Sequence, residues 1–210
     1  TDYIVKNTDL FILRSKTALA FTDSLNIPRK KVRVIYKGIN LEKFKPKSDK
    51  KQVTSDKLKI LFIGNLSKSK GLDDLISVFS ALRTKFPRLQ LIIAGDGEMR
   101  GEVEKLDKKR FVDYRCFVDY ENLPKLYQEA DIFCAPSKFR KFLGIKVWEE
   151  YFSYALMEAQ SSGLPIVATK TGGIPEEVGN KLLVDPGDRG ALEKQLEKLV
   201  VEANLREKLG

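Results

Sequence analysis

Short apolar runs alternate with longer amphipathic segments along most of the chain from residue 58 onward. The apolar runs predict strands at residues 60–63, 89–94, 113–118, 132–135, 166–168 and 182–184. The segments between them predict helices at residues 72–85, 98–108, 123–129, 151–162 and 189–201. Short apolar strands that alternate with helices indicate a parallel sheet with helices on both faces. The fold class predicted from this pattern is therefore α/β, with a Rossmann-like sheet.

The first 45 residues have a less regular pattern. Residues 9–13 and 32–36 predict two strands, and residues 16–25 predict a helix that ends before Ile27-Pro28. Residues 45–59 are rich in lysine and serine and lack periodicity, which is typical of an exposed linker. An ordinary β-α-β start of one domain is the alternative interpretation of this region.

Glycine and small polar residues follow several predicted strands directly. They are Gly64-Asn65, Gly95-Asp96-Gly97, Pro136-Ser137 and Gly172-Gly173. In open parallel sheets the ligand lies outside the carboxyl ends of the strands, so we expect a ligand crevice at this edge. Gly64 permits close approach of the backbone, and Lys68 and Lys70 can reach a phosphate at the start of the next helix.

Two glutamates, Glu150 and Glu158, are separated by seven residues in the segment that leads into the fifth predicted strand. On one helix that spacing corresponds to a rotation of about 80° and a rise of about 12 Å. Phe152, Leu156 and Ala159 would mark the side of this helix that faces the core. Two carboxylates so placed could contact opposite ends of an extended ligand, with phosphates between them. Solvated glutamates at the rim of an amphipathic helix are the plainer alternative.

The composition favours an anionic ligand. The chain has 210 residues, of which 42% are hydrophobic and 32% charged, with a formal net charge of +9. This excess suits nucleoside diphosphates or an anionic membrane surface, although heat adaptation could also explain it. Nucleic acid is disfavoured as a partner, because the lysines are dispersed and are not interleaved with aromatic residues.

Cysteine and histidine usage excludes several kinds of site. The chain has no histidine, so Cys/His metal sites and Ser/His or Cys/His catalytic pairs are excluded. Its two cysteines, Cys116 and Cys134, lie in predicted strands and form no disulfide framework, which favours a reducing cytoplasm. No signal peptide is evident, and no apolar run approaches the ~18 residues of a membrane span. Because the chain begins with Thr1, we expect it to be part of a longer protein.

The segment that begins at Glu150 resembles the signature of the retaining GT-B glycosyltransferases of group 1, the glycogen synthase and sucrose synthase type. That signature contains Glu-x7-Glu, Gly-x-Pro, an apolar strand and Gly-Gly-x-Pro-Glu. The matching residues here are Glu150 and Glu158, followed by residues 163–165 and 172–176. The resemblance covers roughly residues 32–210 and implies the C-terminal domain of the GT-B fold.

The resemblance implies a role for each matching residue. Glu150 would lie at the transferred sugar and support catalysis, and Glu158 would bind the ribose hydroxyls of the donor. The backbone N–H groups of Phe152, Ser153 and Tyr154 would meet the sugar or the diphosphate.

The loop that begins at Gly64 departs from the family pattern. The family usually has Gly-Arg and then Lys-Gly there, and both the Arg and the Lys bind the donor diphosphate. Lys70 matches, but Asn65 stands at the arginine position and cannot form a bidentate contact with phosphate. Either Lys68 compensates or donor binding is weaker. Residues 117–122 also lack the family's glycine, so we expect an altered nucleobase pocket.

The resemblance also implies a domain organisation and a function. Residues 1–45 would be the tail of an N-terminal acceptor domain with the interdomain connection, and residues 46–210 the nucleotide-sugar-binding domain. The basic loop at residues 138–149 would be a lid, an acceptor-facing loop or a simple insert. We expect transfer of a hexose from a nucleoside diphosphate sugar to a glycan, small-molecule or lipid-linked acceptor, with no cofactor and no metal. A non-catalytic binding module and a nucleotide-sugar epimerase on the same fold are the alternatives.

Overall fold

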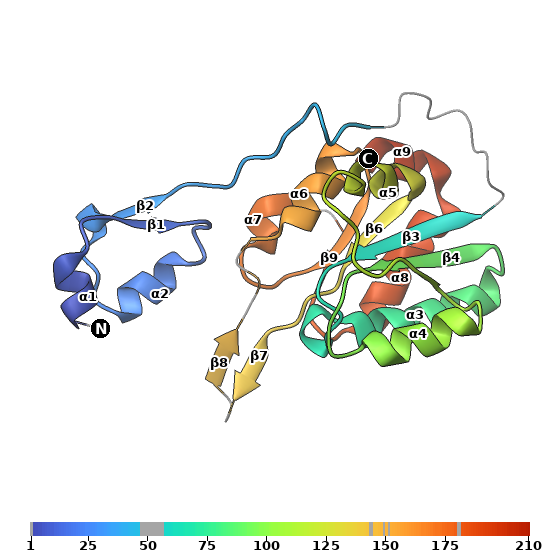
Figure 1. The fold of residues 1–210 in the computed structure, drawn as a ribbon, viewed down its shortest axis with the longest axis horizontal. Coiled ribbons are helices and arrows are strands. Elements are labelled where there is room, and N and C mark those ends of the chain that lie inside the picture. The colour runs from blue at the N-terminus through green and yellow to red at the C-terminus, as the bar shows by residue number, and fades with distance from the viewer. Residues whose placement is uncertain (1, 47–56, 143–144, 149, 151, 180–181) are drawn as a thin grey trace.

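The computed structural model describes residues 2–46, 57–142, 145–148, 150, 152–179 and 182–210. A small N-terminal unit is joined to a larger α/β domain by an extended connection (Figure 1). The N-terminal unit consists of α1 (Asp2–Asn7), β1 (Phe11–Leu13), α2 (Leu19–Ser24), the 3-10 turn η1 (Arg29–Lys31) and β2 (Val32–Val34). Its two strands pair in parallel. Most of the predicted linker at residues 45–59 lies outside the described residues.

The larger domain is built on a six-stranded sheet in the order β10-β9-β6-β3-β4-β5. Every pairing in this sheet is parallel. The strands are β3 (Leu58–Ile63), β4 (Leu89–Ala94), β5 (Asp113–Tyr114), β6 (Ile132–Ala135), β9 (Ile166–Thr169) and β10 (Leu183–Val184). The predicted parallel Rossmann-like sheet is therefore confirmed.

Helices cover both faces of the sheet, and each face has its own apolar core (Figure 1). Alternate residues of β3 show the division, because Ile60 and Phe62 pack in one core and Leu61 in the other. The first core holds residues of α3 (Leu72–Lys85), α4 (Arg100–Lys108), α8 (Arg189–Val201) and α9 (Ala203–Leu209). The second holds residues of α5 (Leu123–Glu129), α6 (Tyr154–Ser161) and α7 (Ile174–Val178).

Several element boundaries differ from the sequence predictions. The strand predicted at 113–118 ends at Tyr114, because Cys116 adopts a left-handed backbone with φ 47°. Cys116 therefore does not lie in a strand, whereas Cys134 lies in β6 and is fully buried. Leu182 has the same positive φ and delays the start of β10. The helix predicted from residue 98 begins at Arg100.

Part of the predicted loop at residues 138–149 forms an antiparallel hairpin. Its strands are β7 (Arg140–Phe142) and β8 (Ile145–Trp148), which lie apart from the main sheet (Figure 1). Residues 143–144 and 149 are outside the described residues. The described part of this segment is therefore ordered as a hairpin, and its role as a lid, an acceptor-facing loop or an insert stays a prediction.

Gly95 lets two strand-end loops meet at the carboxyl edge of the sheet. Its φ is +133°, and a Cβ atom there would overlap the carbonyl oxygen of Gly64. The N–H of Gly64 in turn donates to the carbonyl oxygen of Ala94 at 3.0 Å. The loops after β3 and β4 are thus in direct backbone contact, and only glycine fits at position 95.

Gly95→Ala is therefore expected to destabilise the chain. The left-handed strain and the backbone overlap should together cost about 2 kcal/mol, which corresponds to roughly 4–8 °C in Tm. Gly101→Ala is the matched control, because Gly101 lies exposed in α4 with open space around it. That substitution should raise Tm slightly, since alanine is the better helix former. Equal Tm values for the two variants, measured by thermal denaturation, would contradict the assigned role of Gly95.

Candidate functional site

Two of the predicted site residues, Lys70 and Glu150, meet in front of α6. Lys70 reaches this place from the 3-10 turn η2 (Lys68–Lys70), which follows β3. Glu150 precedes α6, and its carboxylate forms an ion pair with the Lys70 ammonium. The side chains of Lys70 and Glu150 are only 24% and 12% exposed. Burial lowers the pKa of Lys70, and the nearby charge of Glu177 partly opposes this shift.

The backbone of Glu150 is held by the double glycine after β9. Gly173 donates its N–H to the carbonyl oxygen of Glu150 at 2.8 Å. Gly172 has φ +54°, and a Cβ atom there would overlap the same carbonyl oxygen. The two parts of the sequence signature, Glu150 and Gly172-Gly173, are thus in direct contact.

The expectation that Glu150 and Glu158 share one helix was wrong. Helix α6 begins at Tyr154, with Ser153 as its N-terminal cap, so Glu150 lies in the loop before it. The predicted rotation and rise therefore do not apply to this pair. Leu156 is fully buried on α6 as predicted, whereas Phe152 is half-buried ahead of the helix.

Glu158 lies on α6 and is only 5% exposed. The Tyr127 hydroxyl donates to its Oε2 at 2.7 Å. Burial raises the pKa of Glu158, and the Tyr127 hydrogen bond and the Lys43 charge oppose that shift. A carboxylate held in this way keeps acceptor capacity for a ligand hydroxyl.

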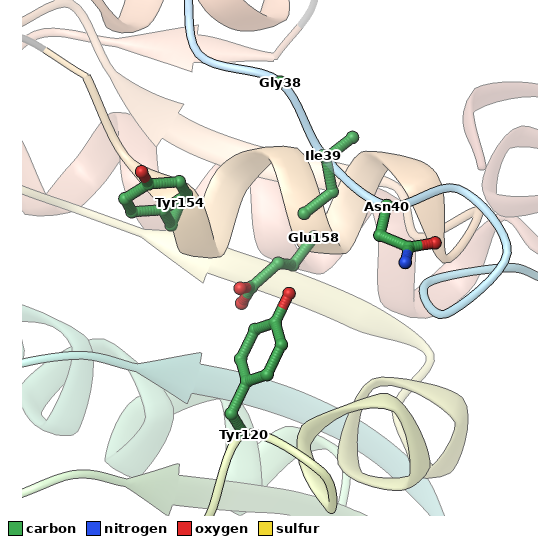
Figure 2. Close-up of a pocket in the computed structure, with 6 residues that line it drawn as sticks. All are labelled: Gly38, Ile39, Asn40, Tyr120, Tyr154 and Glu158. Carbon is green, nitrogen blue, oxygen red and sulfur yellow. The ribbon is translucent and has the colours of Figure 1, made fainter.

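A pocket of about 410 Å³ lies against Glu158. Figure 2 shows the Glu158 carboxylate and the Tyr120 hydroxyl directed toward each other, with the extended connection passing above α6. The residues that line the pocket are Gly38, Ile39, Asn40, Tyr120, Tyr154 and Glu158. The connection and the larger domain thus form the pocket together.

Aromatic contacts fix the Tyr120 side of this pocket. The Tyr120 ring packs edge-on against Phe44 at 5.6 Å between centroids, and Phe44 packs against Tyr127 at 5.8 Å. The Lys43 ammonium lies 3.8 Å from the Tyr120 ring centroid. The predicted nucleobase loop at residues 117–122 therefore contributes Tyr120 to the pocket.

The remaining predicted residues of the first loop lie nearer to solvent. Asn65 and Lys68 are exposed, and the Lys68 N–H donates to Glu98 Oε1 at 3.2 Å. Gly64 is half-buried. The structure thus brings Lys70 against Glu150, whereas Asn65 and Lys68 stay at the solvent side of the loop.

Sequence reasoning missed two charged residues beside the Lys70–Glu150 pair. Glu177 on α7 accepts the N–H of Ser153 at 3.0 Å. Burial raises the pKa of Glu177 to about 7, against the opposing effects of that hydrogen bond and of the charges on Lys37 and Lys70. The Lys37 ammonium lies 3.5 Å from the Tyr154 ring centroid. No local sequence pattern marks either residue. Glu177 follows the exposed Glu176, and Lys37 lies in the extended connection.

The neighbouring Glu176 anchors the N-terminal unit to α7. Its carboxylate accepts the N–H groups of Lys16 at 2.8 Å and Thr17 at 2.6 Å. It also accepts the hydroxyls of Thr17 at 2.7 Å and Tyr36 at 3.1 Å. Partial burial acts to raise the pKa of Glu176, but these four hydrogen bonds outweigh it and lower the pKa. Glu176 therefore binds the N-terminal unit, whereas the adjacent Glu177 binds the backbone at the start of α6.

Within the described residues, the structure contains no cluster of three or more acidic or cysteine side chains that could hold a metal ion. The same described part of the chain has no helix of the length and apolarity needed to cross a bilayer. The expectation that no metal is required stays a prediction.

Known proteins resemble this chain in sequence and in structure. A family model described as glycosyl transferases group 1 matches residues 44–210. The D-inositol 3-phosphate glycosyltransferase of Corynebacterium jeikeium is 30% identical over an alignment of 230 residues, which covers 99% of this chain and 52% of that protein. An uncharacterised glycosyltransferase of Methanocaldococcus jannaschii is 31% identical over 170 residues, which cover 75% of this chain and 41% of that protein. The chain thus spans about half the length of the curated relatives it matches.

Two solved structures share the fold. The sucrose-phosphate synthase of Thermosynechococcus elongatus superposes with a TM-score of 0.77 at 25% identity, over 99% of this chain and 53% of that chain. HepE of Anabaena, solved in complex with UDP, superposes with a TM-score of 0.80 at 19% identity, over 99% of this chain and 58% of that chain.

Proposed function

This chain belongs to the group 1 glycosyl transferases, and from that premise we propose that it is the donor-binding half of a retaining enzyme. In the complete protein it would transfer a hexose from a nucleoside diphosphate sugar to a glycan, small-molecule or lipid-linked acceptor. The observation that carries the proposal is the buried Glu158 at its pocket on α6, with the Lys70–Glu150 ion pair formed by the segment that precedes the same helix. The Glu158 carboxylate is thus available for a nucleoside and the Glu150 carboxylate for a sugar. Lys70 supplies a cation next to Glu150.

The pocket at Glu158 is assigned to the ribose of the donor. A carboxylate can accept hydrogen bonds from two neighbouring hydroxyls, and Tyr127 occupies only part of the capacity of Glu158. The connection at residues 38–40 and Tyr120 line the pocket opposite α6. The nucleobase would lie on that side.

The diphosphate is assigned to the space between Lys70 and the start of α6. Lys70 and the backbone N–H groups of Phe152, Ser153 and Tyr154 would stabilise the charge that develops on the leaving diphosphate. The exposed Lys68 is placed to assist. Glu150 would stabilise the oxocarbenium-like sugar or position its hydroxyls, while the acceptor attacks from the face that the diphosphate leaves. No metal is needed in this scheme, because the cations of the chain neutralise the phosphate charge.

The acceptor would be bound mainly by the missing part of the protein. Curated relatives are about twice as long as this chain, and we assign residues 1–45 to the tail of an N-terminal acceptor domain. The isolated chain should therefore bind donor without transferring sugar. A non-catalytic nucleotide-sugar-binding module is the second candidate function, and the exposed Asn65 at the usual arginine position favours it.

A thermal-shift panel with UDP, ADP and GDP and their sugar conjugates tests this assignment on the chain itself. At 100 times Kd a ligand adds about 2.7 kcal/mol, which should raise Tm by roughly 5–10 °C. A shift with nucleotides of one base would support a donor domain and identify the nucleotide. The absence of any shift would count against donor binding by this chain, and sugar transfer by the isolated chain would contradict the assignment of the acceptor site.

A further inference from the structure

We propose that the Glu177 carboxylate is an internal competitor for the donor diphosphate. It occupies the Ser153 N–H, within the electrostatic influence of Lys70 and Lys37, so it must lose its charge or move away when the donor binds. This inference rests on the proposed function, because it concerns the phosphate part of the same site. Glu177 belongs neither to the Glu-x7-Glu pair nor to the Gly-Gly-x-Pro-Glu string of the signature.

The hydrogen bonds of Glu177 place its carboxylate at the start of α6. Its Oε2 accepts the Ser153 N–H at 3.0 Å, and this amide is one of those assigned to the diphosphate. Its Oε1 is buried and has no hydrogen-bond partner in the described part of the chain. A phosphate oxygen bound to the Ser153 N–H would take the position of the Glu177 Oε2. The protein thus fills a predicted ligand position with its own acid.

The charges of two lysines from other segments act on this carboxylate and oppose the rise in its pKa. Lys70 belongs to the loop after β3 and pairs with Glu150. Lys37 belongs to the extended connection, and its ammonium lies 5.6 Å from the Phe152 ring centroid. Burial lowers the pKa of Lys37, as does the charge of Arg14, and Glu177 opposes that shift.

Among the described residues, only the Ser153 N–H donates to the Glu177 carboxylate. Glu176 on the same helix accepts hydrogen bonds from Lys16 and Thr17, and the Gln160 amide donates to the backbone oxygen of Glu177 at 3.2 Å. The described groups that act on the carboxylate are therefore one amide N–H by hydrogen bond and two ammonium groups by charge. This combination suits a phosphate as well as a carboxylate.

Ionised Glu177 would oppose donor binding in two ways. It withholds the Ser153 N–H from phosphate, and its charge repels the diphosphate in a half-buried site where screening is weak. With a pKa of about 7 the group is neutral in most molecules at pH 6 and charged in most at pH 8. A bound diphosphate favours the neutral form further, so donor binding should take up a proton. Affinity is then highest at low pH and falls as pH rises through about 7.

Isothermal titration with UDP-glucose, ADP-glucose and GDP-mannose tests this inference. Sugar diphosphates suit the purpose, because their diphosphate is a diester without an ionisation between pH 6 and pH 8. For the wild-type chain we expect Kd to rise by about tenfold from pH 6 to pH 8. Glu177→Gln should show little dependence on pH and should bind about tenfold more tightly than wild type at pH 8. Glu104→Gln is the matched control on the surface of α4, and it should keep the wild-type slope.

The possible outcomes separate this inference from the proposed function. Equal affinity of wild type and Glu177→Gln at pH 8 would overturn the inference alone. A pH slope that persists in Glu177→Gln would also overturn it and would assign the slope to another titratable group. Failure of both proteins to bind any of the three sugar nucleotides at pH 6 would overturn the proposed function and this inference with it.

Discussion

Glu150→Ala in the complete enzyme is expected to lower kcat for sugar transfer by about 100- to 1,000-fold, which is the usual loss when one transition-state-stabilising group is removed. The Kd for the donor should change little, because Glu150 is assigned to the reacting sugar and not to the nucleotide. Steady-state kinetics would give kcat, and titration of the same protein with the sugar nucleotide would give Kd.

The ion pair between Lys70 and Glu150 predicts the direction of any change in donor affinity. Without Glu150 the Lys70 ammonium loses one carboxylate that pairs with it, so affinity for the diphosphate should stay the same or increase. Glu102→Ala on the exposed side of α4 is a charge-matched control and should retain full turnover. Turnover of Glu150→Ala near the wild-type value would remove the catalytic assignment. A loss of donor affinity equal to the loss of kcat would instead indicate a binding role.

Much of the fold could be predicted because local sequence and tertiary structure agree. The strand at Leu89–Ala94 is a continuous apolar run, as expected for a strand covered on both faces, and its predicted boundaries are confirmed. The end of β5 could not be predicted, because Cys116 adopts a positive φ without the glycine that usually marks one. The N-terminal helix α1 gave no signal, since none of its residues is buried.

Only those parts of the candidate site that follow from residue spacing along the sequence could be predicted. Lys70, Glu150 and Glu158 were identified from spacing and resemblance, and the structure brings Lys70 and Glu150 into contact. The predicted helical spacing of Glu150 and Glu158 was wrong, because helix α6 starts four residues after Glu150. Lys37 and Glu177 are distant in sequence, and their charges influence each other only in the folded chain, so no local pattern could predict this interaction.

The extended connection links the N-terminal unit to the site. Residues 38–40 line the pocket at Glu158, and the charge of Lys37 acts on Glu177. Beside it, Glu176 binds Lys16, Thr17 and Tyr36. A movement of the N-terminal unit would therefore displace groups at the two proposed donor positions, and if residues 1–45 belong to an acceptor domain as proposed, this provides a physical route between the two domains.

Glu158→Ala is expected to weaken donor binding by roughly 30- to 150-fold. Loss of hydrogen bonds from two ribose hydroxyls to a charged acceptor should cost about 2–3 kcal/mol. Titration of the isolated chain with the nucleotide identified by the thermal-shift panel would measure this change. The loss should be as large for the free nucleoside diphosphate as for its sugar conjugate, because the contact is to ribose.

Tyr127→Phe distinguishes a ribose ligand from a purely structural carboxylate. It removes the 2.7 Å hydrogen bond to Glu158 but leaves the carboxylate in the pocket. If Glu158 binds ribose, this variant should keep Kd within about threefold of wild type while losing about 1 kcal/mol of stability. If Glu158 serves only to hold Tyr127, the two variants should lose stability alike and neither should change Kd. Unchanged Kd in Glu158→Ala would therefore remove the ribose assignment, since that carboxylate is the acceptor on which the assignment depends.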